Sequence, residues 1–280
     1  MDKGLDGGIR SLLWADRGFW ALLGVLAGSY LVLILAMLGA DAWWLATESD
    51  FGSISPERRG ELIAAVKLTL ITCTIAAFIS LLIGVPCGYL LSRVRFPGRA
   101  FVEAVIDIPF VLPPLVVGLS LLLLLRLKIP ALGIDLTGLL YNVPAIIIAM
   151  VAVAAAMAVR TMRTTFDFLP ARPEAVAMVL GCSRAEAFTR VTLPMARRGM
   201  VTAYTLAWAK SMGEFGPITV VAGTIAGRTE VMSTSVFAAI SVGELNAALA
   251  ISLLMILIAG AVMLAVRLIG DGTGAVHERG

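Results

Sequence analysis

Charge and histidine are scarce in this chain. Only 15% of its 280 residues are charged, and the single histidine is His277, near the C-terminus. The phosphate-cradling motif GxxxxGK(S/T) does not occur, and neither does the zinc-protease motif HExxH. No nucleophile stands in a pattern with a base, so we predict no catalytic residues, and we expect that this chain does not itself bind ATP.

Cysteine is scarce as well. The three cysteines, Cys73, Cys87 and Cys182, are too few and too scattered for a metal site or a disulfide framework. We therefore expect no metal ion and no cofactor bound by this chain. The net charge of +3 is small, and it gives no indication of nucleic-acid binding.

Apolar residues are abundant. They make up 59% of the chain, and the mean hydropathy is +0.95, which places the chain in a lipid bilayer. Crossing the hydrocarbon takes about 20 mostly apolar residues in a helix, because lipid cannot satisfy an open backbone. We predict an all-α integral membrane protein with about six transmembrane helices. The candidate windows are residues 19–38, 64–91, 101–125, 143–159, 200–222 and 245–268.

The basic residues predict the orientation of these windows. If both termini are cytoplasmic, most of the lysines and arginines fall on the cytoplasmic side, as the positive-inside rule requires. We therefore expect a multi-pass protein of the bacterial cytoplasmic membrane. One alternative stays open, since Ala40-Asp41-Ala42 could be the cleavage site of a signal peptide. Retaining the first window gives an even number of spans.

The longest interval between windows that we place in the cytoplasm, residues 160–199, has a helical pattern of its own. Pro173 and Glu174 suit the first turn of a helix, and Gly181 suits its end. The apolar face of this helix is predicted to comprise Val176, Val179 and Leu180.

A second helix is predicted to follow at once. Ser183 and Glu186 have the spacing of a capping box, and Pro194 is expected to stop the helix. Its apolar face would comprise Ala187, Phe188 and Val191. Such a pair of helices could rest on lipid headgroups, or it could present a docking surface to a soluble partner.

The spacing in this interval resembles a known motif. Gly181, nine residues, and then Val191-Thr192-Leu193-Pro194 resembles the EAA loop of ABC importer permeases, EAA-x3-G-x9-I-x-L-P. The family glutamate would fall on Ala175, whereas Glu174 stands one place earlier, about 100° away around a helix. The resemblance implies a type I ABC importer permease fold with a cytoplasmic coupling helix, seated in a groove of an ATPase subunit that binds ATP and magnesium. The residues implied are Glu174, Ala175, Gly181, Ser183, Glu186, Val191, Leu193 and Pro194.

Proline interrupts the window 101–125. Pro109, Pro113 and Pro114 must break or kink a helix there. The broken segment either packs as a simple kink or lines a wet cavity. The pattern Leu-Pro-Pro-x-Val-x-Gly, ending at Gly118, resembles molybdate-type oxyanion permeases.

The window 200–222 contains an acidic residue, Glu214. Lys210 lies four residues earlier on the same helix face, so an internal ion pair is one reading. Gly213 and Gly216 bracket the glutamate with a joint that suits a gate or close helix packing. A carboxylate would repel an anion, so we do not expect Glu214 to be a substrate ligand.

The sequence from Gly213 onward resembles a second oxyanion-permease motif. Gly-Glu-Phe-Gly at 213–216, followed by Ala-Gly-x-Ile-x-Gly-x-Thr at 222–229, resembles permeases for molybdate, tungstate and sulfate, and Gly-Glu-Leu at 243–245 favours the molybdate branch. The pathway or gate is predicted to include Pro113, Pro114, Gly118, Ser211, Gly213, Glu214, Gly216 and Thr219.

These resemblances cover residues 64–268, which we expect to form the permease core. Residues 1–63 would hold a tail, the first span and an external loop, and residues 269–280 a cytoplasmic tail. The implied function is the permease subunit of an ATP-driven importer of a tetrahedral oxyanion, molybdate or tungstate. The implied partners are cytoplasmic ABC ATPases, an extracytoplasmic oxyanion-binding protein and a second copy of the chain. A sulfate or thiosulfate importer, a heterodimer, a membrane scaffold, an intramembrane enzyme and an ATP-independent channel stay open.

Overall fold

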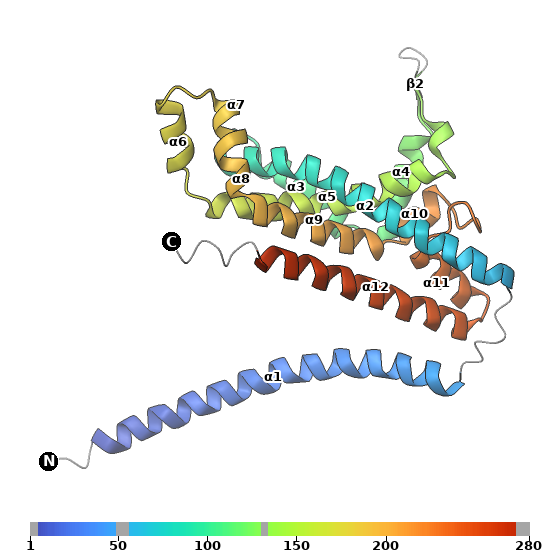
Figure 1. The fold of residues 1–280 in the computed structure, drawn as a ribbon, viewed down its shortest axis with the longest axis horizontal. Coiled ribbons are helices and arrows are strands. Elements are labelled where there is room, and N and C mark those ends of the chain that lie inside the picture. Colours follow the sequence, from blue (N-terminus) through green and yellow to red (C-terminus); the bar gives the residue numbers. More distant parts are fainter. Residues whose placement is uncertain (1–4, 49–55, 130–133, 273–280) are drawn as a thin grey trace. The chain divides into compact units, whose positions relative to one another are not determined.

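The computed structural model describes residues 5–48, 56–129 and 134–272, and nearly all of them are helical (Figure 1). The chain divides into two compact units, residues 1–51 and 52–280. The first unit contains α1 (Leu5–Glu48), and its segment Gly18–Trp44 is long and apolar enough to cross a membrane. No side chain in the hydropathic window of that segment is buried, as expected of a helix that meets lipid.

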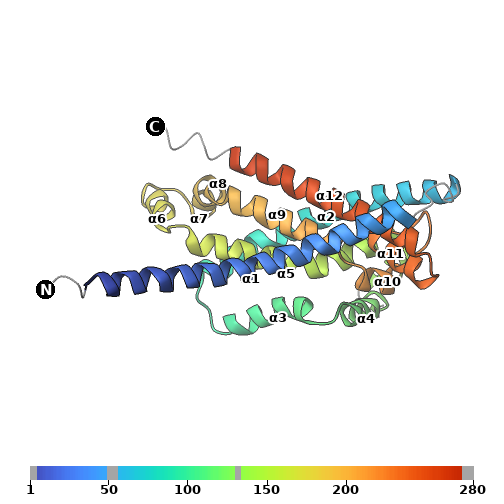
Figure 2. The same cartoon turned by 90° about the horizontal axis from the view of Figure 1, so that it is seen from below.

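Three helices form the centre of the second unit. They are α2 (Pro56–Arg93), α5 (Val143–Phe168) and α9 (Arg197–Met212), which lie side by side in both views (Figures 1 and 2). A Cβ atom at Gly88 would lie 2.7 Å from the backbone nitrogen of Arg163, and one at Gly84 would lie 2.9 Å from the carbonyl carbon of Ala158. The Gly-x-x-x-Gly spacing in α2 therefore allows two backbones to touch, a signal our sequence analysis missed.

Two helices at the C-terminal end complete this unit. The first is α11 (Met232–Ser241), and it packs on α12 (Leu245–Gly272), which runs beside α9 (Figure 1). The Thr69 hydroxyl of α2 accepts a hydrogen bond from the Met232 backbone N–H at 2.9 Å. The start of α11 is thus fastened to α2 by a side chain far away in the sequence.

The described residues contain four helices that could each span a membrane, not six. They are Gly18–Trp44, Gly60–Arg93, Val143–Phe168 and Leu245–Val266. A fifth span is possible if α3 (Arg99–Val111) and α4 (Pro114–Leu125), bent by 110° relative to each other, count as one.

The window 200–222 is not a single helix. Helix α9 ends at Met212, and α10 (Gly216–Val221) begins four residues later, with a proline in its first turn. Proline cannot continue the hydrogen bonding of a preceding helix but fits the start of a new one. The expected count of spans is corrected for this reason.

A short antiparallel strand pair interrupts the helices. Strand β1 (Lys128–Ile129) pairs with β2 (Ile134–Asp135), and the 3₁₀ turn η3 (Thr137–Leu139) follows. The Thr137 hydroxyl and backbone N–H both donate to Asp135, and they lower the pKa of this carboxyl to about 2. Apart from this pair, the described chain is all-α, as the sequence predicts.

Candidate coupling hairpin and broken-helix site

The predicted pair of short helices in the interval 160–199 is present. We call residues 172–195 the α6–α8 hairpin. Figure 1 shows it near one end of the helix bundle, whose centre is formed by α2, α5 and α9. It consists of α6 (Arg172–Val179), α7 (Arg184–Ala187), the π-helical turn η4 (Phe188–Thr192) and α8 (Leu193–Met195).

Gly181 terminates the first helix of the hairpin, as predicted. Its φ angle is +98°, in the left-handed region. The Cys182 N–H donates to the Ala177 carbonyl at 3.0 Å, and the Gly181 N–H donates to the Met178 carbonyl at 3.1 Å. These two bonds make a Schellman cap, which satisfies the last carbonyls of α6.

The capping box of the second helix is confirmed. The Ser183 hydroxyl accepts from the Glu186 N–H at 3.3 Å, and the Glu186 carboxylate accepts from the Ser183 N–H at 2.9 Å. The backbone N–H of Ser183 is the main cause that lowers the pKa of Glu186 below its ordinary value.

The prediction that Pro194 stops the second helix is wrong. Pro194 lies in the first turn of α8, directly after the π-turn. In that turn the Leu193 N–H donates to the carbonyl of Phe188, five residues earlier. A π-turn is wider than an α-turn, so the chain passes a residue that lacks an N–H and would otherwise clash with the carbonyl four residues back.

The two apolar faces of the hairpin lie in different environments. We call Val176, Val179 and Leu180 the α6 tip, and these side chains are 56%, 86% and 80% exposed. Ala187 is fully buried, Phe188 packs against the aromatic core, and Val191 and Leu193 are half-buried. The first helix thus presents an apolar surface, while the second holds the hairpin to the bundle.

Glu174 is turned inward, and the neighbouring Ala175 is exposed. One Glu174 oxygen accepts a hydrogen bond from the Tyr89 hydroxyl of α2, and the other accepts from the Thr192 hydroxyl at 2.9 Å. The sequence indicated a first-turn acid here but gave no sign of the distant tyrosine.

The predicted break in the window 101–125 is confirmed at Leu112 and Pro113, between α3 and α4. Pro114 occupies the first turn of α4, whereas Pro109 lies inside α3 without ending it. Helix α4 then packs against α10, so the two oxyanion-permease motifs meet in space.

Glycines make the α4–α10 contact possible. A Cβ atom at Gly118 would lie 2.9 Å from Cα of Pro217, and one at Gly216 would lie 2.8 Å from Cβ of Pro114. Both distances are shorter than real side chains show, so the contact requires glycine on each helix. Gly213 differs, because the nearest atom to a Cβ there would be 3.9 Å away.

The internal ion pair of the window 200–222 is confirmed. Lys210 Nζ lies 2.5 Å from Glu214 Oε1, and the Glu214 side chain is 2% exposed. The Ser233 hydroxyl donates to the Glu214 carbonyl at 2.7 Å. The carboxylate, which lies between α9 and α10, is therefore neutralised by a lysine in the last turn of α9.

The two hydroxyl-bearing residues predicted for the pathway, Ser211 and Thr219, make hydrogen bonds within their own helices. Ser211 is buried and donates to the Ala207 carbonyl at 2.9 Å, and Thr219 is half-buried and donates to the Phe215 carbonyl at 2.8 Å. At the rim, the exposed Arg228 donates to the Asn142 side-chain carbonyl at 2.6 Å. The membership of Ser211 and Thr219 in a pathway stays a prediction.

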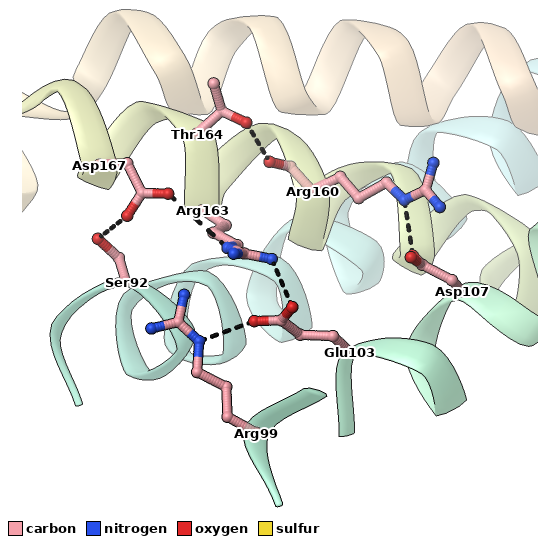
Figure 3. A network of polar contacts seen from close by, with 8 residues as sticks. All are labelled: Ser92, Arg99, Glu103, Asp107, Arg160, Arg163, Thr164 and Asp167. Atoms are coloured by element: carbon pink, nitrogen blue, oxygen red, sulfur yellow. Dashed lines mark hydrogen bonds and ion pairs between the residues drawn. The ribbon is translucent and has the colours of Figure 1, made fainter. Parts of the chain in front are cut away.

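Charged residues hold α3 to α5 (Figure 3). Glu103 Oε1 lies 2.7 Å from Arg99 Nε and Glu103 Oε2 lies 3.1 Å from Arg163 Nη1, while Asp107 Oδ1 lies 2.6 Å from Arg160 Nε. None of the side chains of α3, residues 99–111, is fully buried. The acids four residues apart were the available signal for this contact, and our sequence analysis missed it.

Within the described part of the chain, no group of three or more histidine, cysteine or acidic residues could hold a metal ion. The described residues thus contain glycines that allow two helices to touch, a glutamate whose carboxylate is turned into the protein, and an exposed apolar tip. This arrangement can transmit movement between helices, since the short helices are interrupted and anchored at defined points.

Known proteins resemble this chain in sequence. Residues 80–273 match the family described as binding-protein-dependent transport system inner membrane component. The sulfate transport permease CysT of Escherichia coli K12 is 30% identical over 240 residues, covering 84% of this chain and 82% of the relative. The molybdate/tungstate permease WtpB of Pyrococcus abyssi is 33% identical over 207 residues, covering 74% of this chain and 79% of the relative.

A solved structure shows the same fold. It is the crystal structure of a bacterial ABC transporter involved in the import of the acidic polysaccharide alginate, with a TM-score of 0.67 at 17% identity, covering 92% of this chain and 98% of that one. The fold is therefore that of type I ABC importer permeases, and the family match makes the chain a membrane subunit for transport, not an enzyme. The chain belongs to the family of binding-protein-dependent transport system inner membrane components.

Proposed function

We propose that this chain is the permease subunit of an ATP-driven importer that carries molybdate or tungstate. The observation that carries the substrate class is the α4–α10 contact, because it joins the two motifs that resemble oxyanion permeases. The Gly-Glu-Leu sequence at 243–245 supports the molybdate and tungstate branch. Relatives named for sulfate and for molybdate and tungstate transport support a tetrahedral oxyanion.

Energy for transport comes from a partner. The α6–α8 hairpin docks through the α6 tip into a groove of a cytoplasmic ATPase, which binds ATP and magnesium. The tip supports this role because three adjacent apolar side chains are exposed there. An extracytoplasmic binding protein delivers the oxyanion, and two copies of the chain enclose the pathway between them.

The joint around Glu214 belongs to the gate of this pathway. Its carboxylate does not repel the cargo, since Lys210 lies against it. On one side of the joint, Gly213 gives the backbone conformational freedom. On the other side, Gly216 allows the close contact with α4.

A second candidate substrate is sulfate or thiosulfate. It is favoured by the relative named for sulfate transport, whose match covers 84% of this chain. Such an importer would pair this chain with a different permease. All the contacts described within the chain would serve both substrates equally.

The proposal is tested by uptake into vesicles that hold this chain, its ATPase and its binding protein. Labelled molybdate is supplied with ATP, and unlabelled tungstate or sulfate is added as competitor. Vesicles without the ATPase are the control. We expect ATP-dependent uptake that tungstate suppresses and sulfate does not. Suppression by sulfate at the same concentration would favour the second candidate, and no ATP-dependent uptake would overturn both.

A further inference from the structure

A buried carboxylate in the first helix of the α6–α8 hairpin ties that helix to its surroundings. Both oxygens of Glu174 accept hydrogen bonds from inside the protein, one from Tyr89 and one from Thr192. The side chain is 9% exposed, although it lies in a short surface helix. Glu174 therefore links three pieces of chain: α2, α6 and the π-turn η4.

The Tyr89 ring is held on two sides. Its centroid lies 5.5 Å from that of Phe166 on α5 and 4.6 Å from that of Phe188 in η4. These aromatic contacts fix the position of the ring, so the hydroxyl that bonds Glu174 is fixed as well. The hydrogen bond therefore connects α6 to a side chain of α2 that is packed against α5 and η4.

The exposed side of α6 is opposite the glutamate. At 100° per residue, Val176 and Val179 lie about 200° and 140° around the helix from Glu174. Together with Leu180 they form the exposed α6 tip. The following helix, α7, begins with a charged residue, Arg184, which is exposed. A partner that binds the tip does not reach the Glu174 carboxylate.

We propose that Glu174 is a positioning residue, an internal staple that makes the hairpin move as one body with α2. This inference rests on the proposed function, and it assigns to the loop acid a role different from contact with the ATPase. The α6 tip and Arg184 are then left to meet the ATPase. Breaking the staple should uncouple ATP hydrolysis from transport without releasing the ATPase.

The test compares Tyr89→Phe, Thr192→Val and Glu174→Ala in the full-length chain. Each of the first two variants removes one of the two hydrogen bonds to Glu174 and leaves the surface of α6 unchanged. Tyr204→Phe, which removes the hydroxyl of a tyrosine on α9, is the matched control. Three quantities are measured: trypsin cleavage after Arg184 and Arg190 in the chain alone, co-purification of the ATPase, and oxyanion uptake per ATP hydrolysed.

We expect the staple variants to be cleaved about tenfold faster, because proteolysis follows the open population. They should retain the ATPase while uptake per ATP falls by about fivefold or more. Tyr204→Phe should match the original chain in all three measurements. The cleavage arm tests the staple even if the original chain retains no ATPase, a result that would overturn the proposed function instead.

Two results would overturn the staple. In the first, Tyr89→Phe and Thr192→Val behave like the original chain while Glu174→Ala loses the ATPase, which would make Glu174 a direct contact. In the second, all three variants are cleaved at the original rate with unchanged uptake per ATP, and the carboxylate would then hold nothing in place.

Discussion

The α6–α8 hairpin and the α4–α10 contact are both made from interrupted helices, yet they are held in opposite ways. The hairpin is anchored by side chains, above all Glu174 and Tyr89, and its apolar tip is exposed. The α4–α10 contact is made by backbone against backbone at Gly118 and Gly216. A substitution at the exposed tip therefore leaves the packing of the helices unchanged, whereas the contact at Gly118 and Gly216 cannot accept even a methyl group.

The largest effect is expected at the glycine contact. Gly216→Ala places a Cβ 2.8 Å from that of Pro114, which is part of a rigid ring. We expect a loss of about 1–3 kcal/mol in the free energy of unfolding, as for other overpacked sites, together with a severe loss of uptake. Thermal unfolding in detergent and vesicle uptake would measure the two effects.

Gly213→Ala is the matched control in the same joint. Its φ angle is −84°, and a Cβ there has only one neighbour, at 3.9 Å. The variant should unfold at the original temperature. If the joint is a gate hinge, uptake should nevertheless decrease, because alanine has less conformational freedom than glycine. Equal destabilisation by both variants would contradict the contrast drawn between the two glycines.

The next effect is expected at the hairpin turn. Gly181→Val puts a branched side chain at a φ of +98° in open space, so the cost is conformational strain alone, about 1–2 kcal/mol. Uptake should be lost while the bundle retains its unfolding temperature. Gly181→Asn, which tolerates the left-handed region, should recover part of the uptake. Equal loss by both variants would show that strain is not the cause.

A smaller effect is expected where α3 meets α5. Asp107→Asn removes the charge that pairs with Arg160, whose side chain is 45% exposed. Partly exposed pairs contribute about 0.2–1 kcal/mol, so global stability should hardly change. Hydrogen exchange in residues 99–111 should become faster while exchange in α5 does not. Unchanged exchange in α3 would show that the charged contacts of Figure 3 do not hold this helix.

The smallest effect is a pH dependence at the capping box. The pKa of Glu186 is lowered from its ordinary 4.5 by the N–H of Ser183, so ionised Glu186 favours the folded cap. This stabilisation is complete above the ordinary pKa and is lost as pH falls through the lowered pKa. Hydrogen exchange at residues 184–187, corrected for its intrinsic rate, should increase as pH falls below 4.5. Glu186→Gln, which cannot titrate, should show no such increase.

Local signals in the sequence were sufficient for much of the fold. The turn at Gly181, the box from Ser183 to Glu186 and the break at Pro113 each depend on neighbouring residues, and the structure confirms all three. The pair of Lys210 and Glu214 was likewise predictable from helical spacing.

Contacts between distant segments could not be predicted in this way. Tyr89 is 85 residues from Glu174, and no periodicity links the two positions. The helical path through Pro194 was missed because a π-turn has no clear sequence signature. Apolar composition predicts one span over the window 200–222, although Gly213 and Pro217 mark the break that the structure contains.

If the α6 tip is where the ATPase binds, a charge placed on the tip should abolish that binding. Val179→Glu is made in the full-length chain, and the amount of ATPase that co-purifies is measured beside the unfolding temperature of the chain. Val179 is 86% exposed, so a charge there should leave the bundle folded. We expect loss of the ATPase at an unchanged unfolding temperature. Full retention of the ATPase with normal uptake would contradict it and favour a hairpin that rests on lipid.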